Sequence, residues 1–236
     1  MSAPRAFLLD IEGTTTPIDF VTKTLFPYAR RELSSFLTRS LDDPRLRLAL
    51  VSDCCLLSAE HDQDLKAPSW NNKPDPESSL PYLYWLMDND RKSTGLKSLQ
   101  GRIWEEGYRS GKIQGEVYPD VWPALRRWKN RGAEVYIFSS GSVLAQQLLF
   151  EHLPEGDMTE LIDGYFDTTI GPKREQESYV QIATSMKQVP NDVMFLSDVD
   201  AEVEAARSSG MMARLIDRTG VLPMDSMTLS SFESLP

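Results

Sequence analysis

The chain has 236 residues, enough for one catalytic domain with a modest insertion, and its 41% hydrophobic and 25% charged residues are ordinary for a globular enzyme. The net charge of −10 argues against a nucleic-acid partner, because an acidic surface repels a phosphate backbone. No apolar run approaches the roughly 18–20 residues of a membrane span, and no signal-peptide pattern precedes the first strand, so we expect no membrane partner.

The first predicted element is a buried parallel strand, Ala6 to Asp10, an apolar run that delivers a carboxylate at its C-terminal end. Helical patterns follow, interrupted by a Pro-, Ser- and Asn-rich stretch at 67–81 that predicts a loop. Adjacent cysteines rarely form a disulfide, so Cys54 and Cys55 are expected to be reduced thiols on one of these helices, which favours a cytosolic protein. The expected helices of this region cover residues 27–37, 44–57, 82–90 and 96–109.

After residue 114 the pattern changes, and strand-like apolar runs alternate with helical segments. This alternation predicts an α/β fold with a doubly wound parallel sheet, formed by residues 1–16 and 114–236, and an inserted all-helical cap at 17–113. The tail from Thr219 onward is rich in Ser, Met and Pro and is expected to be weakly ordered. The expected strands cover 134–138, 193–196 and 212–216, and the helices 120–131, 143–150, 175–186 and 202–209.

Two acids follow the first strand, at Asp10 and Glu12, with Gly13 next. Ligands of open α/β sheets bind outside the carboxyl ends of the strands, so both acids can share one site. A carboxylate can attack phosphorus, and a second carboxyl can protonate the leaving oxygen and then deprotonate water. The motif alone is equally consistent with a strand that ends in an acidic turn.

Two further segments could bind an anion. Ser139 and Ser140 follow a middle strand and precede a helix, where hydroxyls and free N–H groups can hold a phosphate. Lys173 lies just before a later helix and could neutralise charge at the nucleophile and the phosphate. Taken singly, the serines are also ordinary helix caps, and a lone lysine is usually a solvated surface residue.

A metal-binding acid is predicted at Asp198, directly after a late strand. Mg²⁺ prefers oxygen ligands, keeps several waters and needs few carboxylates. Glu202 is expected to support Asp198 from the adjoining helix. These residues come in the order Asp after the first strand, Ser after a middle strand, Lys, and Asp after a late strand. This order resembles the four-part pattern of the haloacid-dehalogenase superfamily.

Within that superfamily the sequence resembles the enolase-phosphatase E1 (acireductone synthase) family. At the position of Glu12, most phosphatases of the superfamily have a second Asp, whereas the E1 family has Glu followed by Gly-Thr-Thr. The similar segments are LLDIEGTTTPIDFV, LFPYAR, LKSLQGRIW, VYIFSSGSVLAQQLLF, GYFDTTIGPKREQESY and FLSDVDAE, which together span roughly residues 5–215.

The resemblance implies a bifunctional enzyme of methionine salvage and thus of methionine biosynthesis. It would enolise the small phosphorylated diketone 2,3-diketo-5-methylthiopentyl 1-phosphate and then dephosphorylate it to the acireductone 1,2-dihydroxy-3-keto-5-methylthiopentene. The resemblance further implies a monomer that uses one Mg²⁺ per chain and resides in the cytoplasm, and in eukaryotes also in the nucleus. By matching position, Asp10, Glu12 and Asp198 would bind Mg²⁺, and Ser139, Ser140 and Lys173 would bind substrate.

Three other functions remain open at the level of sequence. A phosphatase or phosphotransferase of another small sugar or keto phosphate would share every site residue and differ in the cap. A hydrolytic dehalogenase needs no metal and would leave Glu12 and Asp198 without a role. A non-enzymatic interaction protein predicts the loss of Asp10, Lys173 or Asp198, and all three are present.

Overall fold

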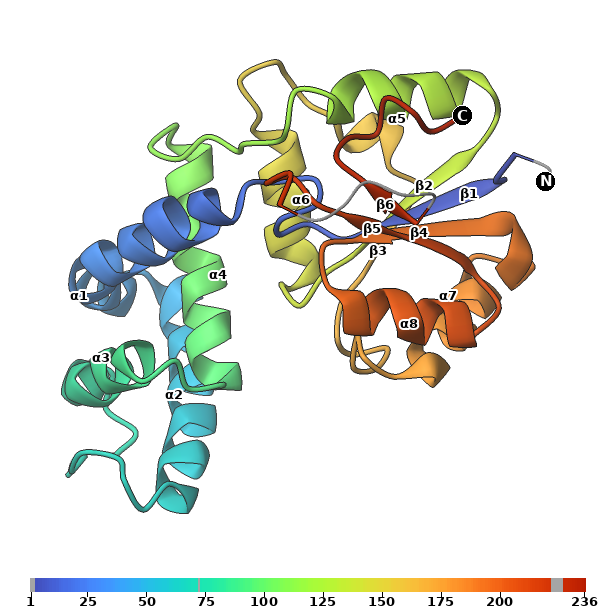
Figure 1. Cartoon of the computed structure of the whole chain (residues 1–236). Helices are drawn as coiled ribbons and strands as arrows, with labels where there is room; N and C mark the ends of the chain where they lie inside the picture. Colours follow the sequence, from blue (N-terminus) through green and yellow to red (C-terminus); the bar gives the residue numbers. More distant parts are fainter. Residues whose placement is uncertain (1–2, 72, 222–226) are drawn as a thin grey trace. The chain divides into compact units, whose positions relative to one another are not determined.

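The computed structural model describes residues 3–71, 73–221 and 227–236. The chain divides into two compact units, Met1–Val21 with Gln114–Pro236, and Thr22–Ile113. The first is built on a β-sheet and the second from helices (Figure 1). The domain limits expected from the sequence, with a cap at 17–113, stay a prediction. In the described ranges, no helix combines the length and apolar character needed to cross a membrane.

A six-stranded parallel sheet forms the centre of the first unit, in the order β3-β2-β1-β4-β5-β6. β1 and β4 lie next to each other at its middle and are buried along their whole length, which explains why both are nearly continuous apolar runs. The predicted α/β fold is therefore confirmed. The strands are β1 (Ala6–Leu9), β2 (Glu134–Phe138), β3 (Gly164–Phe166), β4 (Val193–Ser197), β5 (Met212–Ile216) and β6 (Thr228–Leu229).

Helices cover both faces of this sheet. In Figure 1, α7 (Gln176–Ser185) and α8 (Asp200–Ser208) lie side by side on one face, and α5 (Val121–Asn130) lies on the other. The apolar positions of α5 recur at helical spacing and end with Trp128, whose ring stacks on Phe7 of β1 with centroids 3.7 Å apart. The remaining long helix of the unit is α6 (Val143–Glu151).

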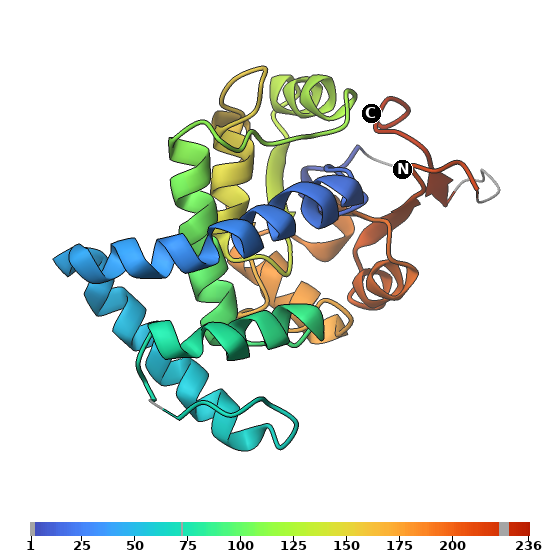
Figure 2. The same ribbon diagram turned by 90° about the vertical axis from the view of Figure 1, so that its left-hand side faces the viewer.

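The described residues of the second unit form helices joined by turns and loops, with no strand among them, and α1 crosses α4 (Figure 2). Helix α4 begins at a capping serine, Ser93, whose Oγ accepts a hydrogen bond from the Leu96 N–H at 3.0 Å. Arg102 of this helix pairs with the buried Asp53 at 3.1 Å. The helices are α1 (Phe26–Asp42), α2 (Pro44–Gln63), α3 (Leu80–Asp88) and α4 (Thr94–Arg109).

Several predictions for this unit need correction at their ends. The predicted loop at 67–81 contains a 3₁₀ turn, Glu77–Ser79, and α3 begins at Leu80, while residue 72 lies outside the described part. A π-helical segment, Phe20–Leu25, precedes α1 and was not predicted. The two cysteines lie on α2 as free thiols, as expected, with Cys54 buried and Cys55 exposed.

The prediction of a weakly ordered tail is wrong for residues 227–236. β6 adds a parallel strand to the edge of β5, and the side chain of Phe232 is fully buried, with its ring centroid 5.6 Å from that of Trp128. The amino-acid composition of the tail gave no sign of this packing, because only a few of its residues become buried. The expectation for residues 222–226 lies outside the described part of the chain.

Candidate active site

Three predicted site residues lie at the carboxyl ends of adjacent strands. Asp10 follows β1, Ser139 follows β2 and Asp198 follows β4, and β1 pairs with both of its neighbours. The Asp10 N–H donates to the carbonyl of Leu196 at 2.9 Å, so sheet hydrogen bonding continues to the nucleophile candidate itself. The sheet topology thus brings together residues that are almost 190 positions apart in the sequence.

Lys173 forms two short ion pairs within this group. Its Nζ lies 2.5 Å from Asp10 Oδ1 and 2.7 Å from Glu202 Oε2, and its side chain is only 10% exposed. Burial acts to lower the pKa of Lys173, but the charges and hydrogen bonds of the two carboxylates outweigh burial and raise it. Lys173 is therefore a buried ammonium group. The hydroxyl of Tyr179 donates to its carbonyl at 2.7 Å and fixes the loop before α7.

Glu202 and Ser197 also belong to this group of contacting side chains. The contact that Glu202 makes differs from the one that the sequence predicts. The sequence predicts that the Glu202 carboxylate supports Asp198, but in the structure it contacts Lys173 and the fully buried hydroxyl of Ser197, which lies 2.9 Å from Glu202 Oε2. The same hydroxyl lies 3.4 Å from Asp10 Oδ2. Burial, followed by the charge of Asp10, raises the pKa of Glu202 against the opposing effect of Lys173.

The loop after β1 lies directly against Asp198. The main-chain N–H of Asp198 donates to Thr14 Oγ1 at 3.0 Å. Gly13 has a φ of +72°, and a Cβ at this position would lie 2.1 Å from Asp198 Oδ2, so any other residue would strain the backbone and displace the Asp198 carboxylate. Thr15 Oγ1 donates back to the carbonyl of Asp10 at 3.1 Å. The loop therefore connects the two aspartates through its own backbone and hydroxyls.

The Asp198 carboxylate has an environment suited to a cation. Burial, followed by the charges of Asp10 and Glu202, raises its pKa to about 6. Among the described residues, no group of three His, Cys, Asp or Glu side chains forms a ready metal cluster. Mg²⁺ does not require one, because it is commonly held by one or two carboxylates and waters. Asp10 and Asp198 therefore fit Mg²⁺ as hard oxygen donors in an acidic site.

Glu12 and the two serines lie at the same edge of the sheet with different exposure. Glu12 is exposed and forms an isolated bridge with Thr16. Ser139 is buried, and its Oγ accepts a hydrogen bond from the Gly141 N–H at 3.1 Å, whereas Ser140 is exposed. In the described structure, neither serine hydroxyl is hydrogen-bonded to Asp10 or Lys173.

The sequence did not single out Thr14, Ser197 or Gln146, which hold the site loops. The buried Gln146 of α6 donates through Nε2 to the carbonyls of Gly141 and Phe166, at 2.8 and 2.9 Å, and so anchors the serine loop to β3. Thr14 and Ser197 lie close in sequence to predicted site residues, and only this proximity could have pointed to them from the sequence. Gln146 lies within an ordinary helical pattern and gives none.

Comparisons with known proteins assign the fold to a family. The family model of haloacid dehalogenase-like hydrolases matches residues 4–210. The solved structure of the UTR4 protein of Saccharomyces cerevisiae has a TM-score of 0.79 at 33% identity and covers 98% of this chain and 100% of its own. The structure of CbbY from Rhodobacter sphaeroides in complex with phosphate has a TM-score of 0.58 at 15% identity, which indicates a shared fold. The family model and the fold together define a haloacid dehalogenase-like hydrolase.

Curated relatives narrow this class further. The enolase-phosphatase E1 of Synechococcus elongatus is 49% identical over 233 residues, which cover 97% of this chain and 96% of the relative. The enolase-phosphatase E1 of Danio rerio is 42% identical over 92% of this chain and 86% of its own length. The chain belongs to the enolase-phosphatase E1 family and is a phosphatase enzyme. The family prediction made from the sequence is confirmed.

Proposed function

We propose that this chain enolises 2,3-diketo-5-methylthiopentyl 1-phosphate and then hydrolyses the phosphate ester, giving 1,2-dihydroxy-3-keto-5-methylthiopentene and phosphate in methionine salvage. The observation that carries the proposal is the buried contact of Asp10 with Lys173 beside Asp198, in a chain of the enolase-phosphatase E1 family. A buried acid held by an ammonium group at the carboxyl edge of a parallel sheet suits attack on phosphorus.

In the phosphatase step, Asp10 acts as the nucleophile. Its carboxylate attacks phosphorus to form an aspartyl-phosphate, and the bond between phosphorus and the ester oxygen breaks. Glu12, two residues further along the loop, gives a proton to the leaving oxygen and then takes one from the attacking water. Hydrolysis of the aspartyl-phosphate releases phosphate and restores Asp10. Lys173 remains protonated through both steps and compensates negative charge at Asp10 and the phosphate.

We assign one Mg²⁺ per chain to Asp10, Asp198 and an oxygen of Glu12. When bound, the ion supplies Lewis-acid polarisation of the substrate carbonyl and offsets the charge of the phosphate. The neighbouring charges of Asp10 and Glu202, which add to burial in raising the pKa of Asp198, support a cation there. Ser139 and Ser140 are the proposed phosphate-binding residues, from the loop that Gln146 anchors.

In the enolisation step, a base removes a proton from the carbon next to the substrate carbonyl. Glu12 is our candidate, because it is exposed and adjoins the proposed metal site. Its role is tested with a non-hydrolysable phosphonate analogue, on which only enolisation can proceed. Glu12→Gln should abolish the rise in enol absorbance, and enolisation at the wild-type rate would exclude Glu12 as the base.

The helical unit, Thr22–Ile113, is the proposed source of substrate specificity. We further propose that the enzyme acts as a monomer without nucleic-acid or membrane partners, in the cytoplasm and, in a eukaryotic cell, also in the nucleus.

The deciding experiment follows enol absorbance and phosphate release separately on the diketo-phosphate, with Mg²⁺ added or chelated. The proposal predicts that the enol appears before phosphate and that chelation stops both signals. Phosphate release from a panel of sugar and keto phosphates, with the diketo-phosphate no better than the others, would instead favour a phosphatase of another substrate. Turnover that survives chelation would overturn the metal assignment.

A further inference from the structure

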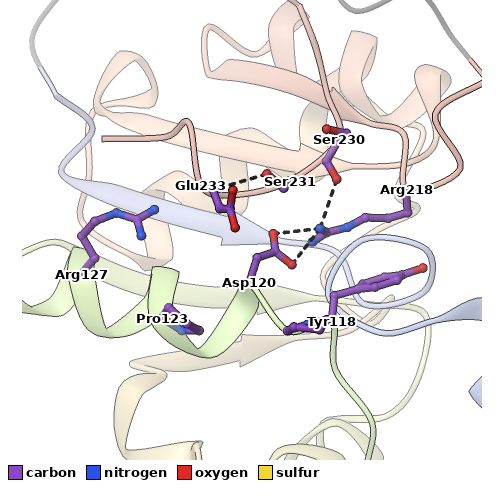
Figure 3. Close-up of a pocket in the computed structure, with 9 residues that line it drawn as sticks. Tyr118, Asp120, Pro123, Arg127, Arg218, Ser230, Ser231 and Glu233 are labelled. Atoms are coloured by element: carbon purple, nitrogen blue, oxygen red, sulfur yellow. Dashed lines mark hydrogen bonds and ion pairs between the residues drawn. The ribbon is translucent and has the colours of Figure 1, made fainter.

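A buried arginine outside the predicted site joins the C-terminal segment to the loop after β1. Arg218 donates from Nη1 to both carboxylate oxygens of Asp120, at 2.9 and 2.8 Å, and the two side chains are only 7% and 9% exposed (Figure 3). Its guanidinium lies between the rings of Tyr118 and Phe232, 4.3 and 4.7 Å from their centroids. Such a planar, paired and stacked group is held in one orientation.

The other two nitrogens of the Arg218 guanidinium, Nε and Nη2, donate to the loop after β1. Nε and Nη2 both donate to the carbonyl of Thr14, at 3.0 and 2.7 Å. Thr14 in turn accepts the main-chain N–H of Asp198 through its hydroxyl at 3.0 Å. One threonine is thus held by Arg218 through its carbonyl and by Asp198 through its side chain. This makes a continuous chain of contacts from Asp120 to the proposed metal-binding acid.

A cavity lies beside Arg218, but binding of a ligand there does not account for the contacts that this arginine makes. It has a volume of about 310 Å³ and is lined by Arg127, Glu233 and Ser231 as well as by the Arg218–Asp120 pair. Every nitrogen of the Arg218 guanidinium already donates to Asp120, Thr14 or the Ser230 carbonyl, so the group is not presented to a ligand. Its contacts are those of a residue that fixes a loop.

We propose that Arg218, held by Asp120, is a positioning residue that sets the 13–16 loop and thereby the placement of Asp198 relative to Asp10. The proposal rests on the proposed function, since it assigns these two acids to the metal and the phosphoryl group. Arg218 touches neither acid and acts through Thr14. A loop that shifts by about 1 Å can cost on the order of 100-fold in rate, because reacting groups must be aligned.

The test compares Arg218→Gln with a matched control, Arg127→Gln. Arg127 also holds the C-terminal segment, through its Nη2 and the carbonyls of Phe232 and Leu235 at 2.7 and 3.2 Å, but it has no contact with the loop. If Arg218 only anchors that segment, both variants should lose thermal stability and keep the same kcat. If Arg218 positions the loop, only Arg218→Gln should lose kcat.

Two readouts separate positioning from stability. We expect Arg218→Gln to lower kcat for phosphate release on the order of 100-fold, with a smaller change in KM. The Mg²⁺ concentration that half-saturates binding, measured by calorimetry without substrate, should rise about 10-fold, as is typical when a residue supporting a metal ligand is lost. Arg127→Gln should match the wild type in both values. Wild-type kcat and Mg²⁺ affinity in Arg218→Gln, or equal losses in the two variants, would overturn the proposal.

Two conservative variants keep the test decisive if Arg218→Gln does not fold. Arg218→Lys retains the charge but not the fork of donors, and Asp120→Asn retains the shape of the partner without its charge. Both should show an intermediate loss of kcat and of Mg²⁺ affinity, and wild-type values in both would refute the positioning role. If wild-type protein releases no phosphate from the diketo-phosphate, the proposed function fails, while the Mg²⁺ titrations still decide whether Arg218 positions the loop.

Discussion

Gly13→Ala is the sharpest perturbation of the site that the structure offers. The added Cβ would lie 2.1 Å from Asp198 Oδ2, whereas ordinary contact begins near 3.4 Å, so the two atoms must separate by about 1.3 Å. The carboxylate is the end of a short side chain and can move, so the displacement should harm activity more than stability. We expect a fall in kcat on the order of 100-fold for a displacement of this size.

Backbone strain has to be separated from this displacement, since Gly13 has a φ of +72°. Alanine in the left-handed region costs roughly 1–2 kcal/mol wherever it occurs. Gly132, which follows α5, has a φ of +78°, and a Cβ added there would meet nothing within 4 Å, so Gly132→Ala carries the same strain without the contact. Both variants are compared by urea unfolding and by phosphate release from the diketo-phosphate. Similar losses of stability with a loss of kcat in Gly13→Ala alone are expected, and equal kcat values would refute the reasoning.

Three further predictions concern stability and reactivity. Phe232→Ala should lower the free energy of unfolding by about 3–5 kcal/mol in urea, because the ring is fully buried, and a change below about 1 kcal/mol would mean that the tail does not belong to the core. Lys173→Gln leaves two buried carboxylates without their cation and should cost about 3–5 kcal/mol in the presence of a chelator, so wild-type stability would contradict the described ion pairs. Burial raises the pKa of Cys54 to about 12, so at about pH 8 it stays protonated, and a thiol reagent should modify only Cys55 until the protein is unfolded. Reaction of both thiols in the native protein would contradict this prediction.

The parts of the fold that the sequence predicted are those with a strong local pattern. β1 and β4 are buried on both sides and therefore read as apolar runs, and α5 shows its buried face at regular helical spacing. β3 and β6 have three and two residues, too few to show any periodicity, and they exist because a longer neighbouring strand offers hydrogen bonds. Their formation depends on contacts with residues distant in the sequence, which the pattern of a short segment does not reveal.

The site divides in the same manner. The positions of Asp10 and Asp198 at the ends of strands could be predicted because each is an acid directly after an apolar run, and the order of motifs along the chain linked them. The contact of Glu202 with Lys173 could not be predicted, because it depends on how α8 and the loop before α7 meet in space. The sequence placed Glu202 close to Asp198. It could not determine whether the Glu202 carboxylate would contact Asp198 or Lys173.

The remaining freedom of the site lies in the loop after β1. The N–H of Asp10 is hydrogen-bonded to the carbonyl of Leu196 in β4, whereas the N–H of Asp198 is hydrogen-bonded to Thr14 of the loop. The placement of Asp198 therefore depends on this loop, which also packs on its carboxylate. Thr14 holds this loop to Asp198 on one side and to Arg218 on the other. Substitutions in the C-terminal segment can therefore change the placement of a reacting group without contacting substrate. If Arg218 positions the loop as proposed, the described tail would influence the chemistry through Phe232, which packs against this arginine.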